Sequence, residues 1–287
     1  HFLTPEGVWV LPGGAGAVEQ ALDGNHWRAA GLEIDCQKPH RRWSVRFHGQ
    51  LQPMDARGEA MDGPLVRCGF DFEFESSSEP YIPGTDDDPS LVARHLGEAN
   101  WDLELLRSLR RRRIRGYTQS GEVVGTASIG MNLIPLYASC LRVHTWGPRD
   151  WGGSDTAFQA FGSLAQARPG SPEQPQAQRF WVHQANFPWV TLEGGWIQEG
   201  QGLTPVADIG VTREQTPGRP VRRAGLTLVH ALGEWEIEAE AIAHHSFDID
   251  GRGRMTVTLA RFTGGHQGWG LWVSVRRIVP GQRRLTG

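Results

Sequence analysis

The stretch EWEIEAEAI, residues 234–242, decides the fold class of this 287-residue chain. Glutamates occupy every second position, and apolar side chains stand between them at Trp235, Ile237, Ala239 and Ala241. A period of two places successive side chains on opposite faces of a β-strand. The pattern therefore predicts a strand with one buried face and one face in water, which is typical of antiparallel sheets.

The same alternation recurs elsewhere in the chain. Buried faces are predicted at Trp43, Val45 and Phe47, at Cys68, Phe70, Phe72 and Phe74, and at Met255, Val257 and Leu259. Asp71, Glu73 and Glu75 form the opposite face of the second group. This face is either solvated or, if it points into a barrel, the source of a buried general acid. Residues 114–119 and 123–129 indicate a hairpin, because the Ser-Gly pair between them suits a tight turn.

The second half contains enough predicted strands for a barrel. Seven strands are predicted there, at residues 180–184, 189–196, 205–211, 221–230, 234–242, 255–262 and 271–278. Each half supplies about six to eight strands, which is enough to close or nearly close an antiparallel barrel. We therefore expect an all-β protein with two tandem barrel domains, residues 1–152 and 153–287.

A helical segment interrupts the strands of the first half. Apolar residues recur at helical spacing between Pro89 and Arg113, with a break expected near Gly97 and Asn100. We expect this insertion, near residues 89–113, to belong to the first domain. Four consecutive arginines, residues 110–113, end the segment. They indicate either a solvated last turn favoured by the helix dipole or a phosphate-binding site.

Composition narrows the possible functions. The net charge is -3 and the charges are interspersed, so no basic surface for nucleic acid is expected. No apolar run has the length of a membrane span. Three cysteines without zinc-type spacing indicate a reduced, cytoplasmic protein. Phosphate-binding, dinucleotide-binding and nucleophile-elbow motifs are missing, and His244, His245 and Asp248 do not belong to an EF-hand pattern. We expect neither a cofactor nor a metal.

The decapeptide RVHTWGPRDW, residues 142–151, is the best candidate for a reactive site. Its imidazole, His144, titrates near neutral pH, a carboxylate such as Asp150 can orient that ring, and the indoles of Trp146 and Trp151 can contact an apolar or cationic ligand. A structural interpretation is also open. In that case the histidine ties strands together, the indoles fill space, and Arg149 forms an ion pair with Asp150.

The decapeptide resembles the signature of the AttH-like and carotenoid 1,2-hydratase-like superfamily, in which Asp-His-Ser/Asn-Trp/Phe-Gly is followed by Arg-Asp-Trp. YTQSGEVVG (residues 117–125), WSVRFHGQL (residues 43–51) and GGHQGWGLW (residues 264–272) resemble other segments of that family. The resemblance implies two tandem lipocalin-like β-barrels. It also implies hydratase or cyclase activity on polyenes or polyketides.

Two positions depart from the family pattern. Val143 stands where the family has an acidic residue directly before the histidine, and no acidic residue lies around Trp272. An Asp-His pair would hold the imidazole in one tautomer and raise its basicity. Here Asp150 or a distant carboxylate would have to do so.

We therefore expect a cofactor-independent lyase or isomerase that acts on a hydrophobic polyene, terpenoid or polyketide in a tryptophan-rich cavity. His144 and Asp150 are the expected catalytic residues. Expected substrate-binding residues are Trp146, Arg149, Trp151, Tyr117, Gln119, Trp181 and His183. The alternative to substrate binding is an exposed polar position for Tyr117 and Gln119. For Trp181 and His183 the alternative is a packed core. The alternative function is a non-catalytic lipocalin-like carrier of a hydrophobic small molecule.

Overall fold

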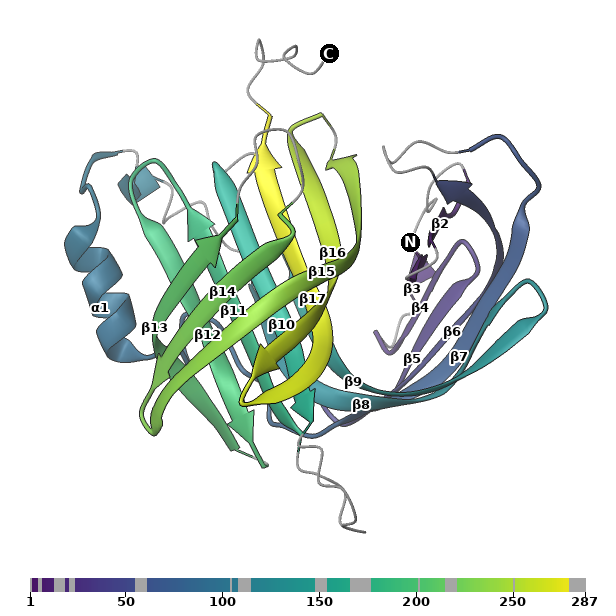
Figure 1. Cartoon of the computed structure of the whole chain (residues 1–287), viewed down its shortest axis with the longest axis horizontal. Coiled ribbons are helices and arrows are strands. Elements are labelled where there is room, and N and C mark those ends of the chain that lie inside the picture. Colours follow the sequence, from purple (N-terminus) through teal and green to yellow (C-terminus); the bar gives the residue numbers. More distant parts are fainter. Residues whose placement is uncertain are drawn as a thin grey trace. The chain divides into compact units, whose positions relative to one another are not determined.

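The computed structural model describes residues 2–4, 7–12, 19–20, 24–54, 61–103, 105–107, 115–147, 154–165, 177–200, 202–214, 221–249 and 251–278. These residues form mostly β-structure, arranged in two antiparallel sheets (Figure 1). The chain divides into two compact units: His1–Pro80 with Thr118–Val143, and Tyr81–Tyr117 with His144–Gly287. The predicted all-β, antiparallel fold class is confirmed.

The first sheet has nine strands. Their bounds are β1 Phe2–Thr4, β2 Gly7–Val10, β3 Glu19–Gln20, β4 His26–Ala29, β5 Leu32–Lys38, β6 Arg42–Met54, β7 Val66–Ser76, β8 Arg115–Ile129 and β9 Asn132–Trp146. The order runs from β3 to β9, while β2 pairs with the last residues of β6 and with β1. In the described residues, this sheet is open and does not return from β9 to β3.

The alternation of apolar and polar residues predicted correctly which faces of β6 and β7 are buried. Trp43 packs with Phe74 and Val123 in one small core, and Phe47 packs with Cys68 in another. The three acidic residues of β7 are all exposed, which excludes a buried general acid among them. They belong to the solvated face.

The predicted hairpin at Ser120 and Gly121 is wrong. Strand β8 continues through both residues, and its backbone at Gly121 pairs with Ser76 of β7. A Cβ atom at Gly121 would lie 2.3 Å from the Phe74 ring, so the glycine permits close packing rather than a turn. The actual turn lies at Gly130, which has φ of 61°, and Met131, between β8 and β9.

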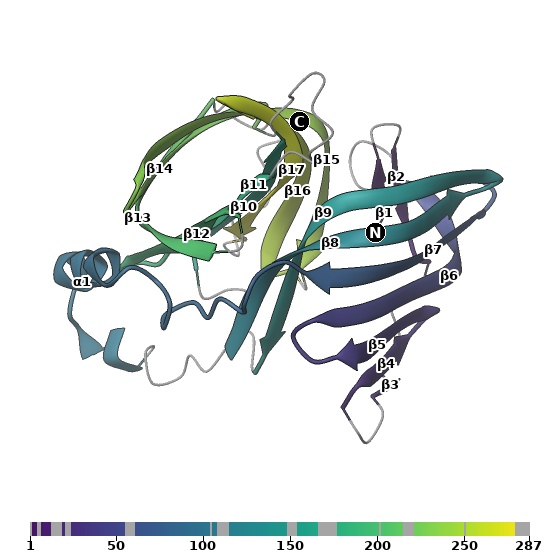
Figure 2. The same cartoon turned by 90° about the horizontal axis from the view of Figure 1, so that it is seen from below.

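The second sheet closes into an eight-stranded barrel, as Figure 2 shows. Its strands are β10 Thr156–Ala165, β11 Gln178–Asn186, β12 Thr191–Glu199, β13 Gly202–Arg213, β14 Arg223–His230, β15 Gly233–Ile249, β16 Gly253–Gly264 and β17 His266–Arg277. Each strand pairs antiparallel with the next along the chain, and β10 pairs with β17 to complete the ring. The expected barrel of the second half is therefore present, although the sequence pattern had not indicated β10.

Apolar side chains pack the centre of the barrel. Phe180 and Phe262 meet edge to face with ring centroids 5.2 Å apart, and Leu226, Leu228 and Trp272 join the same core. On β16 the buried side chains are Thr258, Ala260 and Phe262. The prediction of Met255, Val257 and Leu259 was therefore wrong: these residues are only partly buried and lie on the opposite face.

Helix α1, Pro89–Glu98, packs on this barrel. The Asp88 side chain accepts hydrogen bonds from the first free backbone amides, and Pro89 suits the first helical position. Strands β12 and β13 pair only between residues 196–199 and 202–205, and α1 contacts both strands. Arg94 bonds Asp208 of β13 at 2.6 Å, while His95 lies 3.3 Å from Glu193 of β12. The predicted helical insertion thus links β12 and β13 through side-chain contacts.

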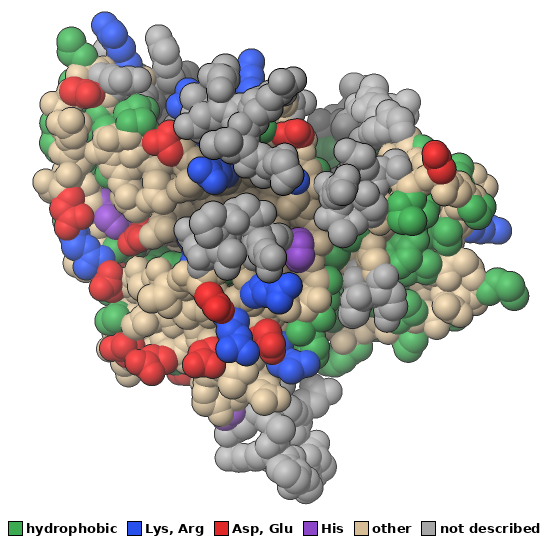
Figure 3. Space-filling view, turned by 45° about the horizontal axis from the view of Figure 1, so that its top comes forward, with side chains coloured by type: hydrophobic (Ala, Val, Ile, Leu, Met, Phe, Trp, Pro, Cys, Tyr) green, Lys and Arg blue, Asp and Glu red, His purple; other side chains and the backbone are tan. Residues whose placement is uncertain are grey.

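The rest of the insertion is helical at residues 103 and 105–107, while the four consecutive arginines, residues 110–113, lie outside the described residues. None of the described helices has the length and apolar character needed to cross a membrane. On the face shown in Figure 3, acidic and basic side chains are interspersed. This distribution matches the charge pattern of the sequence.

Candidate functional site

The decapeptide begins inside β9 and brings its histidine beside two aromatic rings. The ring centroids of His144 and Trp146 are 5.3 Å apart, and those of His144 and Tyr117, on β8, are also 5.3 Å apart. The Tyr117 hydroxyl lies 3.4 Å from Nδ1 of His144. Residues two apart on a strand share a face. This spacing explains why His144 and Trp146 contact the same tyrosine.

Burial decreases across this aromatic cluster, which we define as Tyr117, His144 and Trp146. Tyr117 is buried, His144 is partly buried, and Trp146 is 48% exposed. The hydroxyl of Tyr117 can donate to an unprotonated Nδ1 or accept from a protonated one, depending on the tautomer. The cluster thus places a hydroxyl beside an imidazole nitrogen, at a distance that is long for a hydrogen bond, next to an accessible indole.

The remaining decapeptide predictions differ in outcome. Arg149, Asp150 and Trp151 lie outside the described residues, so their roles stay predictions. Val143 is half exposed, and its alternation with His144 directs it to the other face of β9. An acid at position 143 would therefore not face the imidazole in this strand.

Gln119 occupies a fully buried structural position. Its side-chain amide donates to the backbone oxygens of His40 and Ser78 and to Oγ of Ser76, at 2.9 to 3.2 Å. Its carbonyl oxygen accepts from Arg142 at 3.5 Å, and the Arg142 guanidinium stacks 3.9 Å from the Trp43 ring centroid. These bonds tie strand β8 to neighbouring segments. Contact between Gln119 and a substrate stays a prediction.

Trp181 and His183 lie together on the outer face of β11, because their neighbours Phe180 and Val182 belong to the barrel core. Their ring centroids are 4.9 Å apart. Tyr81 packs edge to face on Trp181, with centroids 6.2 Å apart. The two residues expected to line a cavity therefore belong to a packed cluster outside the barrel.

A carboxylate holds this outer cluster together. The Tyr81 hydroxyl lies 2.7 Å from Oδ1 of Asp87 and 2.9 Å from the carbonyl oxygen of Gly195, so its single proton has two acceptors. The backbone amide of Gly84 donates to Oδ2 of Asp87 at 2.6 Å. Burial, together with the Asp87 charge, raises the pKa of the Tyr81 hydroxyl. Sequence reasoning missed Tyr81 and Asp87, because neither belongs to a recognisable motif.

His183 makes the stability of this region sensitive to acid. Burial lowers the pKa of its imidazole from 6.5 to about 4, against the opposing effect of the Asp87 charge. Between about pH 6.5 and 4 the unfolded chain binds this proton more readily than the folded chain does. The free energy of unfolding is therefore expected to fall as the pH is lowered through this window, and His183→Phe should flatten that slope in urea titrations.

The matched control is His48→Gln, which removes an exposed histidine. This control should keep the original dependence of unfolding free energy on pH. An unchanged slope in His183→Phe would contradict the assignment of the acid sensitivity to His183.

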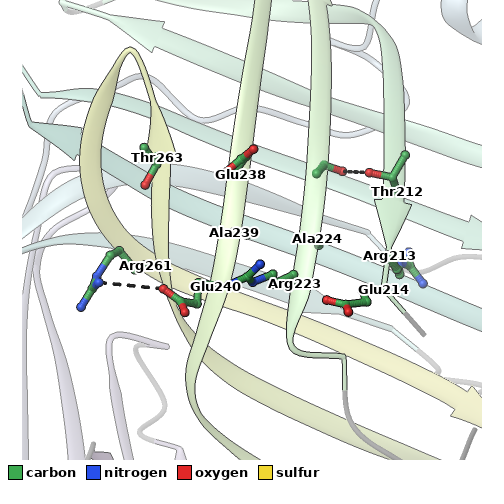
Figure 4. A pocket seen from close by; sticks show the side chains of 11 residues that line it. Thr212, Arg213, Glu214, Arg223, Ala224, Glu238, Ala239, Glu240, Arg261 and Thr263 are labelled. Carbon is green, nitrogen blue, oxygen red and sulfur yellow. Dashed lines mark hydrogen bonds and ion pairs between the residues drawn. The ribbon is translucent and has the colours of Figure 1, made fainter. Parts of the chain in front are cut away.

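A separate hollow of about 580 Å³ lies over strands β13 to β16 (Figure 4). Its lining includes Glu238, Glu240, Arg223 and Arg261, and the last of these lies 3.9 Å from Glu240. Exposed ion pairs of this kind contribute little to stability. Neither this hollow nor a second one of about 600 Å³ includes a predicted site residue. In the described part of the chain, no cluster of three or more His, Cys, Asp or Glu side chains could hold a metal ion.

The fold and the site together define an antiparallel β-protein with a closed eight-stranded barrel and an aromatic cluster around one histidine. The chain belongs to the family described as Domain of unknown function (DUF7064), whose model matches residues 12–276. A comparison with curated proteins found no match.

Proposed function

We propose that this protein is a cofactor-independent lyase or isomerase, a hydratase or cyclase, that acts on a hydrophobic polyene, terpenoid or polyketide. The proposal depends on one observation: the Tyr117 hydroxyl lies 3.4 Å from Nδ1 of a partly buried His144, next to the half-exposed ring of Trp146. The likeness of RVHTWGPRDW to the AttH-like and carotenoid 1,2-hydratase-like signature supports the same class of reaction.

In the proposed mechanism, His144 carries the proton. Its imidazolium donates a proton to one carbon of a substrate double bond, which leaves positive charge on the neighbouring carbon. Attack by another double bond closes a ring, or attack by water completes a hydration. The neutral imidazole then takes back the proton that the cationic intermediate releases. The Trp146 indole face stabilises the transient positive charge.

Tyr117 positions the ring of His144 in this mechanism. Its buried hydroxyl bonds one ring nitrogen and so holds the orientation of the ring, and it can bond either tautomer because a hydroxyl both donates and accepts. Asp150 is retained as a second proposed partner. The substrate would lie against the exposed side of Trp146, because the centre of the barrel is filled by side chains.

A carrier of a hydrophobic small molecule is the second candidate function. Val143 in place of an acid favours it, and antiparallel barrels often serve as binding scaffolds, although side chains fill the centre of this one. Native mass spectrometry of the purified protein and incubation with a panel of polyenes separate the two candidates. Product formation in excess of the protein concentration supports the enzyme. A stoichiometric, chemically unchanged ligand without turnover contradicts the enzyme and supports the carrier.

A further inference from the structure

Arg213 directs a positive charge into the barrel. It is the last residue of β13, and it pairs in register with Ala224, which belongs to the barrel core. Val211, two residues earlier, packs against the same core. Residues two apart on a strand share a face. The Arg213 side chain therefore starts from the inner face.

The guanidinium of Arg213 extends across the interior. Its central carbon lies 4.5 Å from the ring centroid of Phe158 on β10, and β11 and β12 separate these two strands in the ring. Its Nε atom is buried and has no hydrogen-bond partner in the described residues, while the side chain as a whole is partly exposed. Burial lowers the pKa of this guanidinium, as expected when water is removed from a cation.

Thr258 is a second unpartnered donor on the inner face. It lies on β16, two residues before the core residue Ala260, and pairs in register with Trp272. The side chain is 1% exposed, and its Oγ1 has no partner among the described residues. A buried polar group without a partner is destabilising, and more so when it is charged. Guanidinium N–H groups only donate, and the hydroxyl can donate too, so each of the two groups would be satisfied by an acceptor oxygen.

Polar side chains continue along this end of the barrel interior. Ser274 and Gln184 each pair in register with Phe158, and Thr256 pairs with Ser274. Glu193, which pairs in register with Gln184, is already engaged, because it accepts a hydrogen bond from Gln184 and contacts His95. Three exposed carboxylates, Glu214, Glu238 and Glu240, line the hollow of about 580 Å³ that Arg213 also borders. The interior thus changes from apolar at its centre to polar and cationic at one end.

We infer that this end of the barrel binds the carboxylate or phosphate group of an amphipathic ligand, with Arg213 and Thr258 as donors and Phe158 and Trp272 as apolar contacts. The site uses none of the residues of the proposed reaction and goes beyond it. An anionic oxygen would supply the acceptor that Arg213 lacks, and charge-assisted hydrogen bonds to a guanidinium are among the strongest in proteins.

Equilibrium binding of three chain-matched probes to the full-length protein tests this inference. Dodecanoate, dodecyl phosphate and dodecanol are titrated by calorimetry into the wild type, Arg213→Met and Thr258→Val. The wild type should bind at least one of the two anions about tenfold more tightly than the alcohol, because only an anion makes charge-assisted bonds. Arg213→Met should abolish this preference, and Thr258→Val should reduce it less.

Two controls keep the test decisive. Arg28→Met removes an exposed arginine of β4 in the first sheet and should bind like the wild type. The melting temperature of Arg213→Met should stay close to that of the wild type, since methionine keeps an apolar stem beside the Phe158 ring. Equal binding of acid and alcohol by the wild type, or unchanged anion preference in Arg213→Met, would overturn the inference. The measurement needs no turnover, so failure of the proposed reaction is recognised separately.

Discussion

Replacing His144 by glutamine is expected to lower turnover of the substrate by roughly 100-fold to 10,000-fold, the usual contribution of a general acid or base. Glutamine has a similar reach and can still bond the Tyr117 hydroxyl, so the packing of the aromatic cluster should persist. It does not exchange a proton near neutral pH, however. Product formation under saturating polyene measures the loss, and circular dichroism verifies the fold.

Two further variants test whether the lost turnover is specific to His144 and to its hydrogen bond with Tyr117. Tyr117→Phe keeps the ring that packs on His144 but removes the hydroxyl 3.4 Å from Nδ1, so the pH profile of turnover should shift and the loss should be smaller. His48→Gln removes an exposed histidine elsewhere and should leave turnover unchanged. If His144→Gln retained full turnover, His144 would have no part in the reaction.

Truncation of Phe180 to alanine is expected to reduce the free energy of unfolding by about 3–5 kcal/mol. Its ring is fully buried at the centre of the barrel and meets Phe262 edge to face. A Cβ at Gly162 would lie 2.4 Å from this ring, so the glycine leaves the space that Phe180 occupies. Removal of the Phe180 ring therefore creates a cavity, because closure of the barrel holds the surrounding strands apart.

Urea unfolding of Phe180→Ala and of a surface control measures this effect. Leu232→Ala is the control, because Leu232 lies in the turn between β14 and β15 and is 75% exposed. Its unfolding free energy should stay within about 0.5 kcal/mol of the wild type. A loss below about 1 kcal/mol in Phe180→Ala would show that the barrel collapses around the missing ring, contrary to a rigidly packed centre.

Alternation was the most reliable signal in the sequence. It predicted the faces of β6, β7 and β15, because one face of each strand contacts water and the other contacts a core. The pattern failed on β10, where Ala160 and Gly162 alternate with Gln159 and Phe161 and provide little contrast in hydropathy. It also selected the wrong face of β16, where both faces carry apolar residues.

Local composition misled the turn prediction at Ser120 and Gly121. A Ser-Gly pair suits a turn when it is considered alone, but here Gly121 lies against the Phe74 ring of a neighbouring strand. That contact joins residues far apart in the sequence. The preference of the pair for a turn is weaker than the packing that the sheet imposes.

Some features of the candidate sites were likewise predicted from the sequence, while others depend on the fold. The decapeptide identified His144 and Trp146 as a pair, since residues two apart on a strand share a face without any knowledge of the fold. Tyr117 was also singled out, but its contact with the imidazole depends on the positions of β8 and β9. Asp87, Tyr81 and Arg213 had no signal, because each acquires its environment from strands distant in the chain.

The sequence by itself determined that this protein is antiparallel and mostly β, because alternating hydropathy is a local property that a single strand already expresses. Only the tertiary structure decided that the second sheet closes while the first stays open in the described residues, and that Trp181 and His183 point outward. The position of the Arg213 guanidinium inside the barrel was also decided by the tertiary structure. These features depend on which strands pair and in what register, and register is set by the packing of the whole sheet.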